Sequence, residues 1–261
     1  MKLVLPREHG AWGMLYTPLA MAAATLGLGP RGLLLGLAAT FLYLAHEPLD
    51  RLVNYRTANG HRPASGVQGQ EMRRWLLLYL GLGLLAALAL LAGPGAAALL
   101  GVGLATLAVL GVVMWLSGHG HRYSLWTRVL AAAGLSLGAP AYAAAQVGEI
   151  PRAAWMVALY SFFFFMGSIY RVRVHIRAQG KEEFRATSLW GHVGILTAAA
   201  ATAALRWAPA PAPLSLLPGL LQALVLWRRG PDALVPKALG MRELRLNLAF
   251  FGILAAAYRL G

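Results

Sequence analysis

Long apolar runs with few charges constrain this chain more than any other feature of its sequence. A helix that crosses a membrane needs about 20 mostly apolar residues. The sequence predicts nine such helices, at residues 11–28, 32–47, 75–92, 95–116, 129–147, 153–170, 188–205, 214–227 and 244–258. No long polar stretch separates them, so we expect one integral membrane domain over residues 1–261.

The composition excludes several classes of soluble protein. Apolar residues make up 59% of the chain, which is too many for a disordered protein, and the absence of cysteine excludes a disulfide-stapled secreted domain. The net charge of +14 would suit a nucleic-acid binder, but a soluble binder would not carry so many apolar runs. We therefore expect an all-α, polytopic membrane protein, of bacterial type by composition, with no nucleic-acid partner.

The Lys and Arg residues fall mostly on one side of the predicted helices. If the N-terminus lies in the cytoplasm, all but four of the 23 basic residues flank cytoplasmic helix ends. The four exceptions are Arg31, Arg152, Arg206 and Arg259. Because cytoplasmic loops are enriched in Lys and Arg, this asymmetry predicts a multi-pass protein of the cell (inner or plasma) membrane with a cytoplasmic N-terminus.

The end of the second predicted helix carries a dense polar segment, HEPLDRLVNYR at residues 46–56. In a helix, Glu47, Asp50 and Asn54 lie on one face because they are spaced i, i+3 and i+7. Carboxylate and amide oxygens suit Mg²⁺, which takes one or two protein carboxylates together with substrate phosphates. Ionisable groups at membrane depth favour a functional site. The alternative is a capped helix end in which Asp50 pairs with a neighbouring arginine.

This segment and the residues after it resemble the UbiA superfamily, the intramembrane aromatic prenyltransferases. In that family the second helix ends in NDxxDxxxD, and an RPxxSG element follows. The corresponding residues here are His46, Glu47, Asp50 and Asn54, and residues 62–66 read RPASG. Residues 123–138, with Arg128 among them, are similar to the family's connection between the fourth and fifth helices. The opening REHGAW at residues 7–12 resembles the start of the YwiC-like membrane proteins.

The resemblance implies a nine-helix, UbiA-like bundle with a cytoplasm-facing cavity for an isoprenoid diphosphate. It implies Mg²⁺ as cofactor and transfer of the prenyl group to an apolar or aromatic acceptor. Glu47 and Asp50 would be metal ligands and catalytic residues, and His46 would orient the ligands or carry a proton. The residues expected to bind substrate are Asn54, Arg62, Arg128, Arg171, His175 and Arg177.

The second acidic motif of that family has no counterpart here. It should lie at the end of the sixth predicted helix, where residues 167–177 read GSIYRVRVHIR and contain no acid. Helical spacing places Arg171 beside His175, and Arg173 beside Arg177. Arginine binds phosphate bidentately, so these cations could replace the second metal. The alternative is a positive-inside loop that sets topology and contacts anionic membrane lipid.

Three functions stay open on the sequence. The first is a Mg²⁺-dependent prenyltransferase with a degenerate second acidic motif. The second is a non-catalytic protein that binds a lipid, quinone or isoprenoid phosphate, or serves as a partner subunit, and the missing acids favour it. The third is a small-solute transporter, which is disfavoured because the outer half of the chain offers few polar groups for an exit path. The oligomeric state is not predicted.

Overall fold

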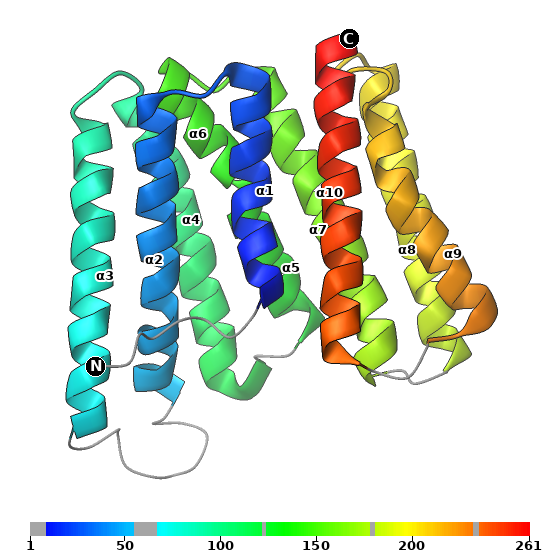
Figure 1. Ribbon diagram of the computed structural model, residues 1–261, viewed down its shortest axis with the longest axis horizontal. Helices are drawn as coiled ribbons and strands as arrows, with labels where there is room; N and C mark the ends of the chain where they lie inside the picture. The colour runs from blue at the N-terminus through cyan, green and yellow to red at the C-terminus, as the bar shows by residue number, and fades with distance from the viewer. Residues whose placement is uncertain (1–8, 55–66, 122–123, 178–180, 232–234) are drawn as a thin grey trace. The chain divides into compact units, whose positions relative to one another are not determined.

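The computed structural model describes residues 9–54, 67–121, 124–177, 181–231 and 235–261, and these form helices without a strand (Figure 1). The α-helices are α1 (His9–Leu26), α2 (Pro30–Asn54), α3 (Val67–Leu91), α4 (Ala96–Leu116), α5 (Leu125–Ser136), α6 (Gly138–Val147), α7 (Arg152–Arg177), α8 (Glu182–Ala204), α9 (Leu217–Arg229) and α10 (Pro236–Leu260). There are also two short helical segments: η1 (Ser117–His121) follows α4, and η2 (Ala212–Leu216) precedes α9. The predicted all-α class is confirmed over these residues.

Each of the nine predicted apolar segments is helical over most of its length. The fifth is divided between α5 and α6, and the eighth begins in η2. In the described part of the chain, the segments long and apolar enough to cross a membrane are Pro30–Leu49, Gly69–Leu91, Ala96–His121, Leu125–Val147 and Arg152–Ile176. These five segments are compatible with a multi-pass membrane protein.

The count of nine spans and the orientation of the N-terminus stay predictions. Helix α9 shows why the number of spans depends on the length of each helix. It has 13 residues, which extend over about 20 Å, whereas the hydrocarbon core of a bilayer is about 30 Å thick. Helix α9, which begins among prolines, is therefore short for a complete crossing of the membrane.

The chain divides into two compact units, each of which is described by itself. Unit 1 comprises residues 1–9, 28–131 and 141–150, and so contains α2, α3, α4 and parts of α5 and α6. Unit 2 comprises residues 10–27, 132–140 and 151–261, and so contains nearly all of α1 together with α7 to α10. A single membrane domain over residues 1–261 stays a prediction.

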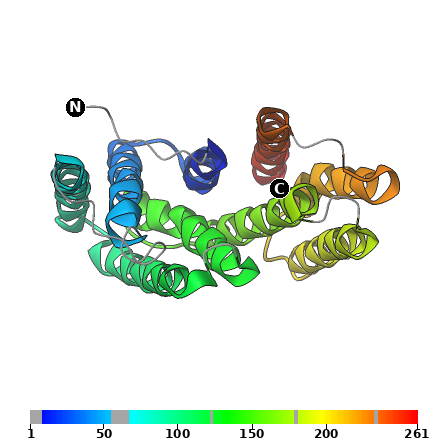
Figure 2. The same ribbon diagram turned by 90° about the horizontal axis from the view of Figure 1, so that it is seen from below.

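In unit 1, α2 and α3 pack along each other (Figures 1 and 2). At one end of this unit, Arg31 donates hydrogen bonds to backbone carbonyls of neighbouring helix ends and of the turn after α3. Its Nε donates to the carbonyl oxygen of Ala145 at 2.6 Å, and its Nη2 donates to those of Leu90 at 2.8 Å and Pro94 at 3.1 Å. The last carbonyls of a helix have no partner inside the helix, and Arg31 supplies one. Arg31 is one of the four arginines that do not flank a predicted cytoplasmic helix end, and these hydrogen bonds account for its position.

The outer faces of α3 and α4 are strongly apolar. Leu77 and Leu85 on α3 are 71% and 67% exposed, and Leu104 and Leu107 on α4 are 65% and 63% exposed. Soluble monomers rarely expose contiguous apolar patches of large size. These faces therefore indicate contact with lipid.

Unit 2 is built around α7, which packs against α8, α9 and α10. The ring of Phe164 on α7 stacks on that of Phe250 on α10, with 4.6 Å between their centroids. Four residues earlier on α7, the hydroxyl of Tyr160 donates to the carbonyl oxygen of Ala199 on α8 at 3.0 Å. These contacts fix α7 between its neighbours and so determine which side chains meet Arg171, about two turns beyond the helix centre.

Candidate functional site

The segment predicted to bind magnesium lies on the last two turns of α2. The helix continues through the buried Pro48, so Glu47 and Asp50 share one helix as expected. The Oε1 atom of Glu47 accepts hydrogen bonds from Nε and Nη2 of Arg51 at 2.8 and 2.6 Å. The Glu47 side chain is 19% exposed. Pairing with an arginine, which the sequence offered as an alternative for Asp50, is therefore found for Glu47.

The carboxylate of Glu47 fits a magnesium site only in part. Both hydrogen bonds from Arg51 end on Oε1 of Glu47, and the side chain of Asp50 lies outside the described residues. In the ranges that the structure covers, no group of three or more His, Cys, Asp or Glu could hold a metal ion. One carboxylate suits Mg²⁺ when substrate phosphates complete the coordination, and a site with two carboxylates stays a prediction.

The other predicted substrate ligands are distributed between the two units. Outside the described residues lie Arg62 and the side chains of Asn54 and Arg177. Half-buried in unit 1 are His46 on α2 and Arg128 on α5. Arg171 and His175 belong to unit 2, so a site that they share with Glu47 stays a prediction.

A buried ion pair joins α7 to α10 inside unit 2. Arg171 is 1% exposed. Its Nη2 donates to Oε2 of Glu243 at 2.7 Å, and its Nε donates to Oε1 at 3.1 Å. Ser168, about one turn earlier on α7, also donates to Oε2, at 2.8 Å. The guanidinium that the sequence predicts as a diphosphate ligand is thus bound by a carboxylate of the same chain.

His192 on α8 completes this cluster. Nη1 of Arg171 lies 2.8 Å from Nε2 of His192, and Nδ1 of His192 lies 2.7 Å from the carbonyl oxygen of Ser188. Because a carbonyl oxygen only accepts, Nδ1 carries the proton and Nε2 accepts the bond from Arg171. The geometry therefore fits a neutral imidazole beside the guanidinium. We call Arg171, Glu243, His192 and Ser168 the Arg171 cluster.

His175 follows Arg171 by one turn, as the i, i+4 spacing predicts. Its Nδ1 donates to the carbonyl oxygen of Arg171 at 3.0 Å. Its Nε2 is buried and has no hydrogen-bond partner among the described residues. The spacing is confirmed, whereas contact of His175 with a substrate stays a prediction.

Two glycines leave room for the Arg171 cluster. A Cβ atom on Gly167 would lie 2.8 Å from Nε2 of His192, and one on Gly219 would lie 2.8 Å from Nη1 of Arg171. Side chains essentially never approach so closely. Either methyl group would therefore displace a group that is held by hydrogen bonds.

Gly167→Ala is expected to lower the free energy of unfolding by about 2 kcal/mol, because the added methyl group overpacks the site against the fixed imidazole of His192. The measurement is reversible unfolding of the purified chain in mixed micelles. Gly194→Ala on α8 is the matched control, since a Cβ there meets no atom within 4 Å and alanine favours a helix over glycine. Equal stability of the two variants would contradict the described packing.

Glu243 and His192 are absent from the site residues that the sequence predicts. The available signals were a lone acid at the start of the last apolar segment and a lone histidine within the seventh. Ionisable groups in such segments point to function or to internal pairing. Both contact Arg171, which lies 72 residues from Glu243 and 21 residues from His192 in the sequence.

Comparison with known proteins identifies the first half of the chain. A family model described as YwiC-like protein matches residues 5–143. This range includes the REHGAW segment and the whole of α2, whereas the Arg171 cluster lies beyond it. No curated protein and no solved structure matches the chain. Together with the apolar helices, the family match indicates a membrane protein.

Proposed function

The chain belongs to the YwiC-like protein family, and on this premise we propose that it is a UbiA-like protein of the cell membrane that binds an isoprenoid diphosphate from the cytoplasmic side. The proposed link to the UbiA superfamily rests on residues 46–66. In this proposal, Mg²⁺ and the diphosphate bind together at the polar end of α2. The prenyl group is then transferred to an apolar or aromatic acceptor.

The observation that carries this proposal is the half-buried carboxylate of Glu47 at the end of the candidate span Pro30–Leu49. Ionisable residues at such a depth are costly and are retained for function. Glu47 and Arg51 bring a carboxylate and a guanidinium side by side. The carboxylate suits Mg²⁺ and the guanidinium suits phosphate oxygens. A magnesium diphosphate would therefore offer each of them a partner of opposite charge.

The proposed roles follow from these preferences. Mg²⁺, when bound, would neutralise charge on the departing diphosphate. Glu47 and Asp50 would hold the metal, and His46 would orient the ligands or carry a proton. Phosphate contacts are proposed for Asn54, Arg62, Arg128, His175 and Arg177.

The Arg171 cluster favours a second function, which is binding without catalysis. Glu243 neutralises Arg171 through a 2.7 Å ion pair, so this cation is less available to replace a second metal. A chain with one acidic segment and a paired arginine suits a protein that holds a lipid, quinone or isoprenoid phosphate, or a partner subunit.

Glu47→Gln is expected to lower the rate of Mg²⁺-dependent diphosphate release by about 100-fold, since it removes a charge that stabilises the reacting complex. The purified chain is incubated with labelled farnesyl and geranylgeranyl diphosphates and a mixture of aromatic acceptors, with and without Mg²⁺. Released diphosphate and prenylated product are measured. Glu183→Gln, at an exposed position on α8, is the control and should release diphosphate like the unaltered chain.

The same assay separates the two functions. Saturable binding of prenyl diphosphate that Glu47→Gln weakens, without release, would favour the non-catalytic function. Neither binding nor release by the unaltered chain would contradict both.

A further inference from the structure

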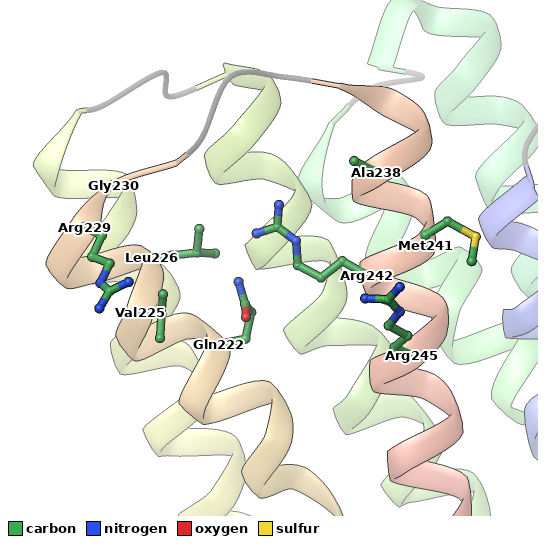
Figure 3. Close-up of a pocket in the computed structure, with 9 residues that line it drawn as sticks. All are labelled: Gln222, Val225, Leu226, Arg229, Gly230, Ala238, Met241, Arg242 and Arg245. Carbon is green, nitrogen blue, oxygen red and sulfur yellow. The ribbon is translucent and has the colours of Figure 1, made fainter.

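A cavity of about 520 Å³ lies between α9 and α10 in unit 2 (Figure 3). Arg242 extends from α10 toward α9, and Gln222 lies opposite it on α9. Gln222 and Arg229 are seven residues apart, and Arg242 and Arg245 are three apart, so each pair shares one face of its helix. The volume falls within the range of small-molecule pockets, about 300 to 1,000 Å³.

The wall of this cavity combines cations with apolar side chains. Arg229, Arg242 and Arg245 bring three positive charges, and Leu226 and Met241 are among the apolar groups. Among the described residues that line it, none is acidic. Such a wall suits an anion, and its apolar part can cover a short length of hydrocarbon attached to that anion.

Glu243 is the acid nearest in sequence to the residues that line the cavity, and its carboxylate points to another part of unit 2. Glu243 follows Arg242 on α10, but its carboxylate accepts hydrogen bonds from Arg171 and Ser168 on α7. Successive residues of a helix are rotated by about 100°, so Arg242 can line the cavity while Glu243 meets α7. The ion pair with Arg171 thus directs this carboxylate toward α7.

We propose that the cavity between α9 and α10 is a binding site for a phosphate group, carried either by an anionic lipid or by a free phosphate. Guanidinium groups present parallel N–H donors that match phosphate oxygens. Basic pockets between membrane helices bind the headgroups of anionic lipids by this chemistry. The amide of Gln222 adds a further donor on the opposite wall.

This site is independent of the proposed function. It uses none of the residues assigned to the isoprenoid diphosphate, so either site can fail while the other stands. The competing interpretation is that these arginines only set the topology, in which case all basic residues on the two helices are equivalent. Arg228 and Lys237 make this comparison possible, because they are exposed, lie on α9 and α10, and do not line the cavity.

The test compares two double variants of the purified full chain in a neutral detergent. Arg229→Gln with Arg245→Gln removes two charges from the cavity, and both positions are exposed, so the fold should be kept. Arg228→Gln with Lys237→Gln removes two charges beside it. Dissociation constants are measured for dioctanoyl phosphatidylglycerol, for zwitterionic dioctanoyl phosphatidylcholine and for inorganic phosphate.

The cavity variant is expected to bind the anionic probe at least about tenfold more weakly than the unaltered chain, and the control variant less than about twofold more weakly. Selective loss with phosphatidylglycerol alone assigns a lipid headgroup, and selective loss with inorganic phosphate assigns a free phosphate. Equal loss in both variants, equal affinity for phosphatidylcholine, or no saturable binding of any probe would overturn the proposal.

Discussion

Replacement of Glu243 by glutamine is expected to lower the free energy of unfolding by about 3 kcal/mol. The carboxylate accepts two hydrogen bonds from Arg171 and one from Ser168, and Arg171 is 1% exposed. An amide can still accept a hydrogen bond, but it cannot neutralise a guanidinium. The variant therefore leaves a buried positive charge without its counter-ion, which is among the most destabilising changes in a protein interior.

Reversible unfolding in mixed micelles measures this effect. Glu183→Gln, exposed at the start of α8, is the matched control and should change stability by less than about 0.5 kcal/mol. The double variant Arg171→Met with Glu243→Leu removes both charges and should be more stable than Glu243→Gln alone. If Glu243→Gln were as stable as the control, the ion pair would contribute nothing measurable to the fold.

The positions of the helices were predictable because they depend on local composition. Residues 95–116 carry no charge and follow a Gly-Pro turn, and α4 runs from Ala96 to Leu116. The fifth segment shows where this approach fails. Residues 129–147 are mostly apolar and carry no charge, but the chain breaks at Leu137 into α5 and α6. Apolarity predicts burial in lipid or protein, and it does not report a break in backbone hydrogen bonding.

The polar end of α2 was predictable for the same reason. Glu47 and Arg51 are four residues apart, and pairs at this spacing meet on any helix. The observed bond between them needs no information about other helices. The spacing of Arg171 and His175 was predictable in the same way.

The partners of Arg171 could not be predicted. Glu243 lies 72 residues away on α10, and His192 lies on α8. The charge asymmetry placed Arg171 at a cytoplasmic helix end, but that rule gives no pairing between helices. Which side chains meet depends on how α7, α8 and α10 pack, and the room for this contact comes from Gly167 and Gly219. A packing glycine and an ordinary one look the same in a single sequence.

Gly95→Ala is expected to destabilise the chain by about 4 kcal/mol, for two separate reasons. Gly95 precedes α4 with a φ of +79°, a left-handed conformation that costs a residue with a side chain on the order of 1 kcal/mol or more. A Cβ atom there would also collide with the carbonyl oxygen of Ala144 and lie 2.8 Å from Cα of Gly148. Both of these atoms belong to the backbone, so they cannot swing aside as a flexible side chain would.

Gly101→Ala on the same helix separates these effects from the general preference of helices for alanine, since a Cβ there meets no atom within 4 Å. It should leave stability unchanged or raise it by up to about 1 kcal/mol. Unfolding of both variants is measured in the same micelles. Arg31, which bonds to the carbonyl oxygens of Pro94 and Ala145, closes the same corner of unit 1, so a loss at Gly95 should be smaller when Arg31→Ala has already loosened it. Simple addition of the two losses would contradict a shared corner, whereas a Gly95→Ala variant as stable as Gly101→Ala would contradict the close approach of α4 to α6.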